Sequence, residues 1–374
     1  MDLSFSEEQL LLRDSVEKFI SDKYSISERN KITATEDGFS AKNWQQFADL
    51  GWLALPFDEE DGGIGGSPVD TMVLMEEFGK GLVVEPYLAT VVMVGTAIAE
   101  YGSGAQKAEI ISGIVDGGLI ASFAYAEQQA QYDLNNIATT AKKDGDIYLL
   151  NGTKSVVLNA QSADKILVST RTSGNQCDSD GITLFLVNAT AEGITRQDYP
   201  TVDGLRASEI EFKDVKIPAD NIVGQLNKGA AIIDKVVTRA ILAIAAEAVG
   251  AMEVLYKDTV EYTKQREQFD HPLSDFQVLK HRMTEMFMEH SLAKSLCMKA
   301  TMLESQGSIE AKRTIHALKY LIGKSGKFIG ENAVQLHGGM GMTEELRVAH
   351  YFKRLMIIDS QLGNSDYHLS QFTK

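Results

Sequence analysis

Two clusters in the C-terminal third of the chain hold residue types that suit a diphosphate. They are Arg266, Phe269 and Gln277 in KQREQFDHPLSDFQ, and Gln335, Gly338 and Gly339 in AVQLHGGMGMTEE. An arginine guanidinium pairs bidentately with a diphosphate, and paired glycines let backbone N–H groups approach a phosphate closely. The residues therefore indicate a phosphate-binding site. A surface arginine and a glycine pair that ends a helix would give the same pattern, so the alternative stays open at this point.

Other familiar chemistries have less support. A glycine-rich stretch, DGGIGG at 61–66, lies between helical patterns, whereas a dinucleotide loop needs a strand before it and a helix after it. No GxxxxGK[ST] and no GxSxG motif occurs. The seven histidines form no HxxxH or HExxH pattern, and Cys177 and Cys297 have no metal-ligand spacing. We predict no metal site.

The bulk properties narrow the partners and the compartment. A net charge of −16 over 374 residues repels nucleic acid and anionic lipid. The longest apolar run, 240–252, contains Glu247 and is shorter than the roughly 20 residues that span a bilayer. The first residues include acids early and lack a basic segment leading into an apolar run, so we predict neither a secretory signal nor a transit peptide. Two cysteines are too few for a disulfide framework, which favours a reducing compartment and hence the cytoplasm. The charge and the short apolar run favour a protein without nucleic-acid or membrane partners.

The elements that must position these residues separate by hydrophobic period into three predicted domains. Residues 1–120 have helical spacing, beginning with the helix-start signal of Ser6 before Glu7 and Glu8. Residues 121–224 hold short β-rich runs at 147–150, 156–158, 166–168 and 182–187, separated by Asp-Gly and Asn-Gly turns. Residues 225–374 return to long helices. The sequence thus predicts an antiparallel β-domain between two helical domains.

Taken together, the motifs resemble the acyl-CoA dehydrogenase superfamily over nearly the whole chain. The matching stretches, in the family's order, are LSFSEEQ, GWLALPFDEEDGG, GLRASEIEFKDVKIPADNIVG, REQF, DFQ and VQLHGGMGMTEE. The resemblance implies a mainly α fold with an N-terminal helical domain, a middle β-barrel-like domain and a C-terminal four-helix domain. It also implies FAD-dependent α,β-dehydrogenation of an acyl-CoA thioester, with electrons passed to an electron-transfer acceptor. In the family, the residues of the two C-terminal clusters reach across a dimer interface to a neighbour's FAD.

The base of the family reaction is missing from both of its usual positions. The glutamate that removes the α-proton usually precedes a Gly-Thr near the C-terminus, and here Leu362 precedes Gly363-Asn364. A minority of members carry it on the first C-terminal helix, near Ala240 of this chain. Neither leucine nor alanine accepts a proton. Asp359 is the best remaining candidate for a relocated base.

The middle domain departs from the family as well. Where members have TEPxxGSD, this chain has AEQQAQYD, so that Gln131 and Tyr132 fill the small Gly-Ser positions. Where members have Trp-Ile-Thr against the flavin ring, this chain has Val156-Val157-Leu158. These changes add bulk where close approach is needed and remove a hydrogen-bond donor. The ring side of the site is therefore predicted to be lost, while the diphosphate side matches.

The contrast between matching diphosphate residues and altered ring residues suggests that two different chains supply the two parts of the site. Within the superfamily, GLVVEPYLATVV, AEQQAQYDLNNIATTA, AEAVGAME and HYFKRLMIIDSQLGNSDYH resemble the small subunit of pimeloyl-CoA dehydrogenase and related subunits. Such chains pair with a larger homologous subunit in a heterodimer or heterotetramer, which would supply the base. Three alternatives remain open: a stand-alone homo-oligomeric enzyme using Asp359, a non-catalytic scaffold subunit without flavin, and a member with other chemistry.

Overall fold

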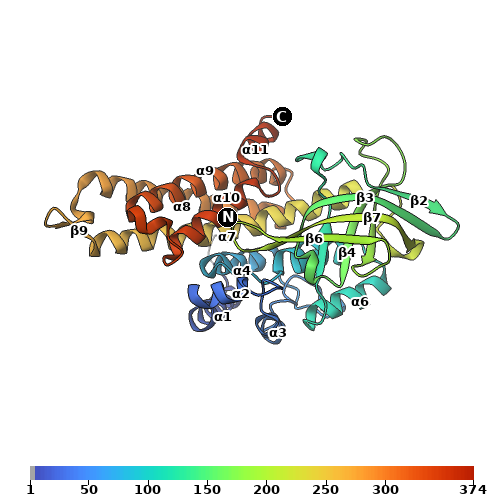
Figure 1. The fold of residues 1–374 in the computed structure, drawn as a ribbon, viewed down its shortest axis with the longest axis horizontal. Helices are drawn as coiled ribbons and strands as arrows, with labels where there is room; N and C mark the ends of the chain where they lie inside the picture. Colours follow the sequence, from blue (N-terminus) through green and yellow to red (C-terminus); the bar gives the residue numbers. More distant parts are fainter. Residues whose placement is uncertain (1–4) are drawn as a thin grey trace. The chain divides into compact units, whose positions relative to one another are not determined.

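The computed structural model describes residues 5–374, so the first two residues of the LSFSEEQ motif lie outside the described part. The chain groups into two compact units, each drawn in Figure 1. Unit 1 comprises the N-terminal segment up to Lys31, Ser67–Val83 and Ile241–Lys374. Unit 2 comprises Ile32–Gly66 and Val84–Ala240. The three domains with boundaries at 120 and 224 stay a prediction.

Unit 1 is helical. Its long elements are α1 (Glu7–Lys23), most of α2 (Ile26–Thr33), α4 (Pro68–Gly81), most of α7 (Gly229–Gln265), α8 (Gln277–Ser305), α9 (Ala311–His337), α10 (Arg347–Ser360) and α11 (Ser365–Phe372). Between them lie β9 (Glu267–Gln268), β10 (His271–Pro272), η6 (Leu273–Asp275) and η7 (Gly338–Met342). Helix α9 packs against α8, α10 and α11 (Figure 1). Ser6 caps α1 in a capping box with Gln9, as its sequence predicts.

Two helices of unit 1 touch through their backbones. A Cβ placed on Gly250 of α7 would lie 1.8 Å from the carbonyl oxygen of Glu76 on α4. A Cβ on Gly79 of α4 would lie 1.9 Å from the carbonyl oxygen of Glu247 on α7. Both glycines are therefore required by the crossing, which brings the acidic side chains of α4 and α7 into the helical core.

Unit 2 contains the sheet and several short helices. The helices are α3 (Ala41–Asp49), η1 (Glu59–Asp61), the π-helical η2 (Leu88–Gly95), α5 (Thr96–Tyr101), α6 (Gly104–Val115), η3 (Gln128–Ala130), η4 (Ala160–Ser162) and η5 (Ala219–Asn221). The strands are β1 (Ala121–Ala124), β2 (Thr140–Asp144), β3 (Ile147–Leu158), β4 (Lys165–Arg171), β5 (Ile182–Asn188), β6 (Ile194–Pro200), β7 (Arg206–Pro218) and β8 (Ile222–Val223). Helix η2 lies against β1.

The eight strands form one sheet in the order β6-β7-β3-β2-β4-β5-β8, with β1 paired to β4. The mainly α architecture with a middle β-domain is confirmed. The sheet is mixed rather than purely antiparallel, because β1 runs parallel to β4. A parallel pair needs a long connection, so no turn dipeptide marks it in the sequence. The two runs predicted at 147–150 and 156–158 are one strand, β3, whose pairing with β7 is interrupted between Lys154 and Val157.

None of the helices in the described range 5–374 has the length and apolar character needed to cross a membrane.

Candidate functional site

The first predicted cluster forms a hairpin that connects α7 to α8. Arg266 follows the last residue of α7 and continues the helical hydrogen bonding, since its N–H donates to the Tyr262 carbonyl over 2.8 Å. Strands β9 and β10 then pair, and Phe269 at their turn is 85% exposed with a φ of 56°. Gln277 is the exposed first residue of α8. Among residues 5–374, the Arg266 guanidinium forms no ion pair and is available to a ligand.

The second cluster is the open turn at the end of α9. Helix α9 ends at His337, and Gly338 adopts a φ of 61° and a ψ of −144°. A Cβ on Gly338 or Gly339 would meet no atom within 4 Å, so the backbone is accessible on this side. Gln335 is exposed one turn earlier. An accessible glycine backbone suits a phosphate, as does the Arg266 guanidinium, which has no ion pair among residues 5–374.

An aromatic stack links these two clusters. The rings of Tyr262 and His337 lie 4.2 Å apart at an interplanar angle of 26°. The Tyr262 hydroxyl donates to the His337 carbonyl over 3.4 Å, and His337 Nδ1 lies 2.8 Å from the Ala333 carbonyl. Burial lowers the pKa of His337, which favours the neutral ring with Nδ1 as the donor. Sequence reasoning missed this pair, although Tyr262 stands one turn before Arg266 and His337 directly before Gly338.

The turn after α10 carries Leu362 in place of the family base. Leu362 has a φ of 59°, in the left-handed region that side chains other than glycine rarely adopt. The buried Lys319 ammonium holds this turn by donating to the carbonyls of Asp359, over 2.9 Å, and Gly363, over 2.6 Å. His368 Nε2 lies 3.0 Å from the Leu362 carbonyl. The backbone of this turn is thus firmly positioned, but the side chain of Leu362 carries no carboxylate.

The nearby acids are engaged elsewhere. Asp359 Oδ1 accepts hydrogen bonds from the N–H and hydroxyl of Ser365, at 3.1 and 2.6 Å, in the first turn of α11. Glu247 forms a buried bidentate ion pair with Arg354, with distances of 2.5 and 2.7 Å. Ala240 on α7 is fully buried and offers only a methyl group. Each carboxylate therefore has a structural contact that accounts for its position.

The middle domain keeps the framework of the family motif around a buried ion pair. Lys154, fully buried on β3, lies 2.7 Å from Glu127 and donates to Ser169. Glu127 also accepts from the N–H groups of Ala138 and Thr139. Burial alone raises the pKa of Glu127, but Lys154 and the hydrogen bonds outweigh it and lower the pKa to about 2. Burial lowers the pKa of Lys154 to about 8 against the attraction of Glu127, so both groups are charged at neutral pH.

Departures from the family motifs coincide with unusual backbone. Gln131, at a family glycine position, has a φ of 49° and a ψ of −107°. Val156, at the family tryptophan position, has a φ of 53° and is 54% exposed at the β3 irregularity. Leu158 follows in the position of the threonine, and an isobutyl group donates no hydrogen bond. The surface that the family presents to a flavin ring is altered on this chain.

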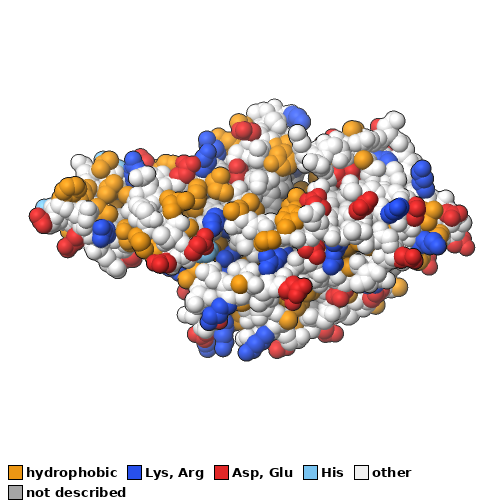
Figure 2. Space-filling view, in the orientation of Figure 1, with side chains coloured by type: hydrophobic (Ala, Val, Ile, Leu, Met, Phe, Trp, Pro, Cys, Tyr) orange, Lys and Arg blue, Asp and Glu red, His pale blue; other side chains and the backbone are white. Residues whose placement is uncertain are grey.

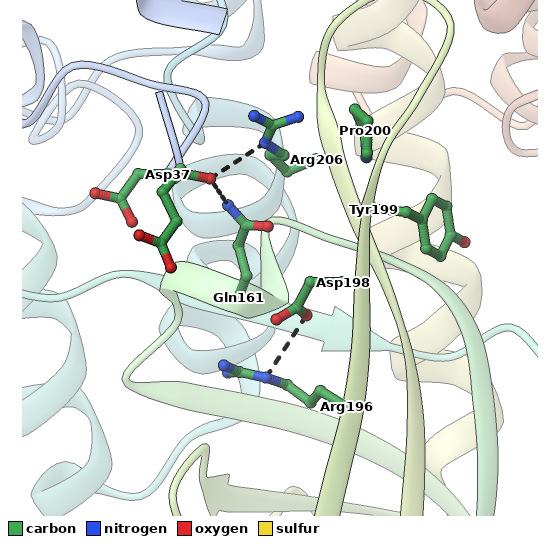
Figure 3. Close-up of a pocket in the computed structure, with 8 residues that line it drawn as sticks. Asp37, Gln161, Arg196, Asp198, Tyr199, Pro200 and Arg206 are labelled. Carbon is green, nitrogen blue, oxygen red and sulfur yellow. Dashed lines mark hydrogen bonds and ion pairs between the residues drawn. The ribbon is translucent and has the colours of Figure 1, made fainter. Parts of the chain in front are cut away.

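A cavity of about 400 Å³ lies in unit 2, and none of the residues of the predicted clusters lines it (Figure 3). It is lined by Glu36, Asp37, Gln161, Arg196, Asp198, Tyr199, Pro200 and Arg206. The Arg206 guanidinium donates to the carbonyls of Thr33, Thr35 and Glu36, and Gln161 donates to the Glu36 carbonyl over 2.7 Å. Arg196 donates to the Ala160 carbonyl over 2.7 Å and pairs with Asp198 over 3.7 Å, so both arginines of the cavity have partners and the mixed charges indicate no particular ligand.

Comparison with known proteins agrees with this fold. The family models for the N-terminal, middle and C-terminal domains of acyl-CoA dehydrogenase match residues 6–118, 122–215 and 227–374. A probable acyl-CoA dehydrogenase of Bacillus subtilis is 28% identical, covering 98% of this chain and 97% of its own. The butyryl-CoA dehydrogenase structure of Megasphaera elsdenii superposes with a TM-score of 0.92 at 27% identity, covering 100% and 99%. The Tcur3481-Tcur3483 steroid ACAD gives 0.89 at 26%, covering 98% and 97%.

Fold and site define the class as a flavin-dependent oxidoreductase of acyl-CoA thioesters, with FAD as the cofactor of the class. The chain belongs to the acyl-CoA dehydrogenase family.

The described residues of the two units differ in how well they suit FAD. At the diphosphate end, Arg266 is unpaired and the Gly338-Gly339 backbone is open to a phosphate. At the ring end, a glutamine side chain stands on a backbone position suited to glycine, and Leu158 offers no donor. The residues at the diphosphate positions therefore suit a diphosphate, whereas the residues at the family's ring positions differ from those that contact a flavin ring.

Proposed function

We propose that this chain is the small subunit of a heteromeric acyl-CoA dehydrogenase whose larger homologous partner supplies the catalytic base. The observation that carries the proposal is the Leu362 turn, which keeps a tightly held, left-handed backbone but no carboxylate. The contacts of Asp359 with Ser365 support a capping role for that acid rather than proton abstraction. A second chain is then needed to remove the α-proton of the acyl-CoA.

In this proposal the C-terminal clusters bind the diphosphate of an FAD seated mainly on the partner. Arg266 pairs with the phosphates, while Gln277, Gln335 and the Gly338-Gly339 backbone supply further donors. Phe269 extends from the hairpin as an exposed apolar contact. When bound, FAD supplies the hydride acceptor of the reaction. The residues of this chain bind and orient the cofactor.

Exposed apolar side chains on unit 1 support a partner at this surface. On α8, Val278, Met288 and Leu292 are more than half exposed, and Met342 of η7 is 66% exposed. Figure 2 shows apolar side chains gathered over the end of unit 1 that holds α8, α9 and β9. Such a concentration on one part of a surface is typical of protein interfaces. The similar Tcur3481-Tcur3483 steroid ACAD bears the names of two chains, which also fits a heteromer.

The resemblance to the small subunit of pimeloyl-CoA dehydrogenase also suggests the substrate and the assembly. We propose a dicarboxylyl-CoA such as pimeloyl-CoA as the substrate, a heterodimer or heterotetramer as the assembly, and a soluble electron-transfer protein as the acceptor. A cytoplasmic location is part of the proposal. A homo-oligomer that uses its own relocated base is the competing arrangement.

The test compares this chain alone with its complex with a homologous subunit that retains the glutamate. We expect one FAD per pair of chains in the complex, and turnover of acyl-CoA only there. Full flavin loading and turnover by this chain alone would refute the proposal. An Asp359→Asn variant in the complex should turn over at the wild-type rate.

A second experiment tests the diphosphate contacts. Arg266→Ala in the complex should weaken FAD binding by about 10- to 100-fold, since a charged hydrogen-bonded pair contributes about 1.5–3 kcal/mol. Arg282→Ala, which removes an exposed arginine from the adjoining helix α8, is the matched control and should leave the affinity unchanged. Equal affinities of the two variants would exclude Arg266 from the cofactor site.

A further inference from the structure

Gln131 has a backbone conformation that belongs to glycine. Its φ of 49° and ψ of −107° fall where a Cβ crowds the neighbouring backbone, and glycine alone adopts this region freely. The side chain is exposed, and within residues 5–374 it forms no hydrogen bond that would compensate for the strain. A glutamine has therefore been accommodated in a loop whose path is set by other residues.

The surrounding contacts show what sets that path. The Ala130 N–H donates to the Glu127 carbonyl over 3.0 Å, and the Asp133 N–H donates to the Ala130 carbonyl over 2.9 Å. The Glu127 carboxylate accepts from the Ala138 N–H over 2.8 Å, on the far side of Gln131, and is itself fixed by buried Lys154. The loop is thus anchored on both sides of Gln131, and the side chain at 131 has no part in the anchoring.

The same loop lies beside the irregular part of β3. The Ser155 N–H donates to the Ala126 carbonyl over 2.9 Å, which joins the start of the loop to the residue before Val156. Val156 also has a positive φ, 53°. The two positions with left-handed backbone therefore lie on neighbouring segments of unit 2. At both positions the backbone has a positive φ, and the side chains differ from those of the family motifs.

We propose that Gln131, with Tyr132 beside it, closes this chain's own flavin-ring surface and so determines which subunit of the pair holds the ring. The proposal rests on the proposed function, because it presumes that the ring is seated on the partner. Its basis is that the backbone at Gln131 has a positive φ that suits glycine, while the position carries a glutamine side chain. Removing those side chains should reopen the surface without rebuilding the loop.

The experiment measures FAD retained by this chain alone, after incubation with excess FAD and dialysis, by visible flavin absorbance. We compare the wild type with Gln131→Gly and with Gln131→Gly combined with Tyr132→Ser. The double variant should retain FAD with at least about tenfold higher affinity, equivalent to about 1.4 kcal/mol. Gln131→Gly should also raise the Tm, because glycine relieves the positive φ. The rise in Tm verifies folding independently of flavin.

Two control variants test whether a gain in FAD binding comes from relieving a positive φ in general or from restoring the hydrogen-bond donor at position 158. Asp214→Gly relieves another positive φ, of 51°, in the same sheet and should retain no more FAD than the wild type. Leu158→Thr restores the missing donor but leaves the obstruction, so it should also show no gain by itself. A gain from Leu158→Thr alone, or no gain from the folded double variant, would overturn the role of Gln131. A wild-type chain already loaded with FAD would instead refute the proposed division between subunits.

Discussion

The buried pair between Glu247 and Arg354 offers a sharp test of which acids in unit 1 are structural. Glu247 lies on α7 and Arg354 on α10, and each side chain is less than 10% exposed. The two hydrogen bonds, of 2.5 and 2.7 Å, form the bidentate arrangement that an arginine makes with a carboxylate. Glu247 is also an acid on the helix that carries the alternative base position, so its role must be distinguished from catalysis.

Glu247→Gln removes the negative charge and leaves the Arg354 guanidinium buried with a neutral partner. Breaking a buried pair by removing one partner costs about 3–5 kcal/mol, and we take the lower value because the amide oxygen still accepts one bond. An unfolding entropy of about 2.1 cal/mol/K per residue gives about 0.8 kcal/mol/K for 374 residues. We therefore expect the Tm to fall by about 4 °C if the chain unfolds cooperatively.

Differential scanning calorimetry provides the measurement, and an exposed pair provides the control. Lys31 and Glu28 also lie 2.5 Å apart, but both side chains are more than half exposed. Glu28→Gln should change the Tm by less than about 1.5 °C, since exposed pairs contribute at most about 1 kcal/mol. The double variant Glu247→Leu with Arg354→Met should regain most of the loss. An unchanged Tm for Glu247→Gln, together with abolished turnover of the complex, would refute the structural role and make Glu247 the base.

Three further predictions concern stability. Burial lowers the pKa of His290 to about 4. Between pH 6.5 and 4 only the unfolded chain binds a proton at this histidine, so the folded state loses stability as the pH drops through that range. His290→Phe should make the Tm less dependent on pH between those values. Because the pKa of Glu127 is lowered to about 2, the ionised carboxylate stabilises the folded state fully above pH 4.5, and this contribution is lost as the pH falls towards 2. In urea titrations, Glu127→Gln should lower the free energy of unfolding at pH 7 and remove this dependence on acid. Gly250→Ala should cost several kcal/mol or prevent folding, judged by circular dichroism, whereas Gly104→Ala, with open space around its Cβ, should leave the Tm unchanged or slightly raised.

Much of the fold could be predicted because its signals are local. Ser6 with its acidic followers predicts the start of α1, and the capping box confirms it. The β-rich runs between turn dipeptides predict strands that the structure contains. The parallel pairing of β1 with β4 was not predictable in this way, because it joins residues 121–124 to 165–168 without a turn between them. Local periodicity does not report such a contact.

The site shows the same limit. The residue types at Arg266 and Gly338 indicate phosphate chemistry, yet nothing in the sequence shows that Tyr262 and His337 stack to link them. Likewise, the sequence reveals that Gln131 replaces a small residue but not that its backbone retains a positive φ. Side-chain identity is local information, whereas backbone strain arises from anchoring contacts elsewhere in the loop. Only the structure shows that the backbone at Gln131 has a positive φ although its side chain is not that of a glycine.

If this chain has no base of its own, it cannot remove the α-proton of an acyl-CoA, and proton exchange measures that step by itself. The chain alone, supplied with excess FAD, is incubated with an acyl-CoA in deuterated buffer, and deuterium at the α-carbon is measured by mass spectrometry. We expect no exchange above the buffer rate, and exchange once a homologous subunit bearing the glutamate is added. Rapid α-deuteration by this chain alone would show that the chain carries its own base.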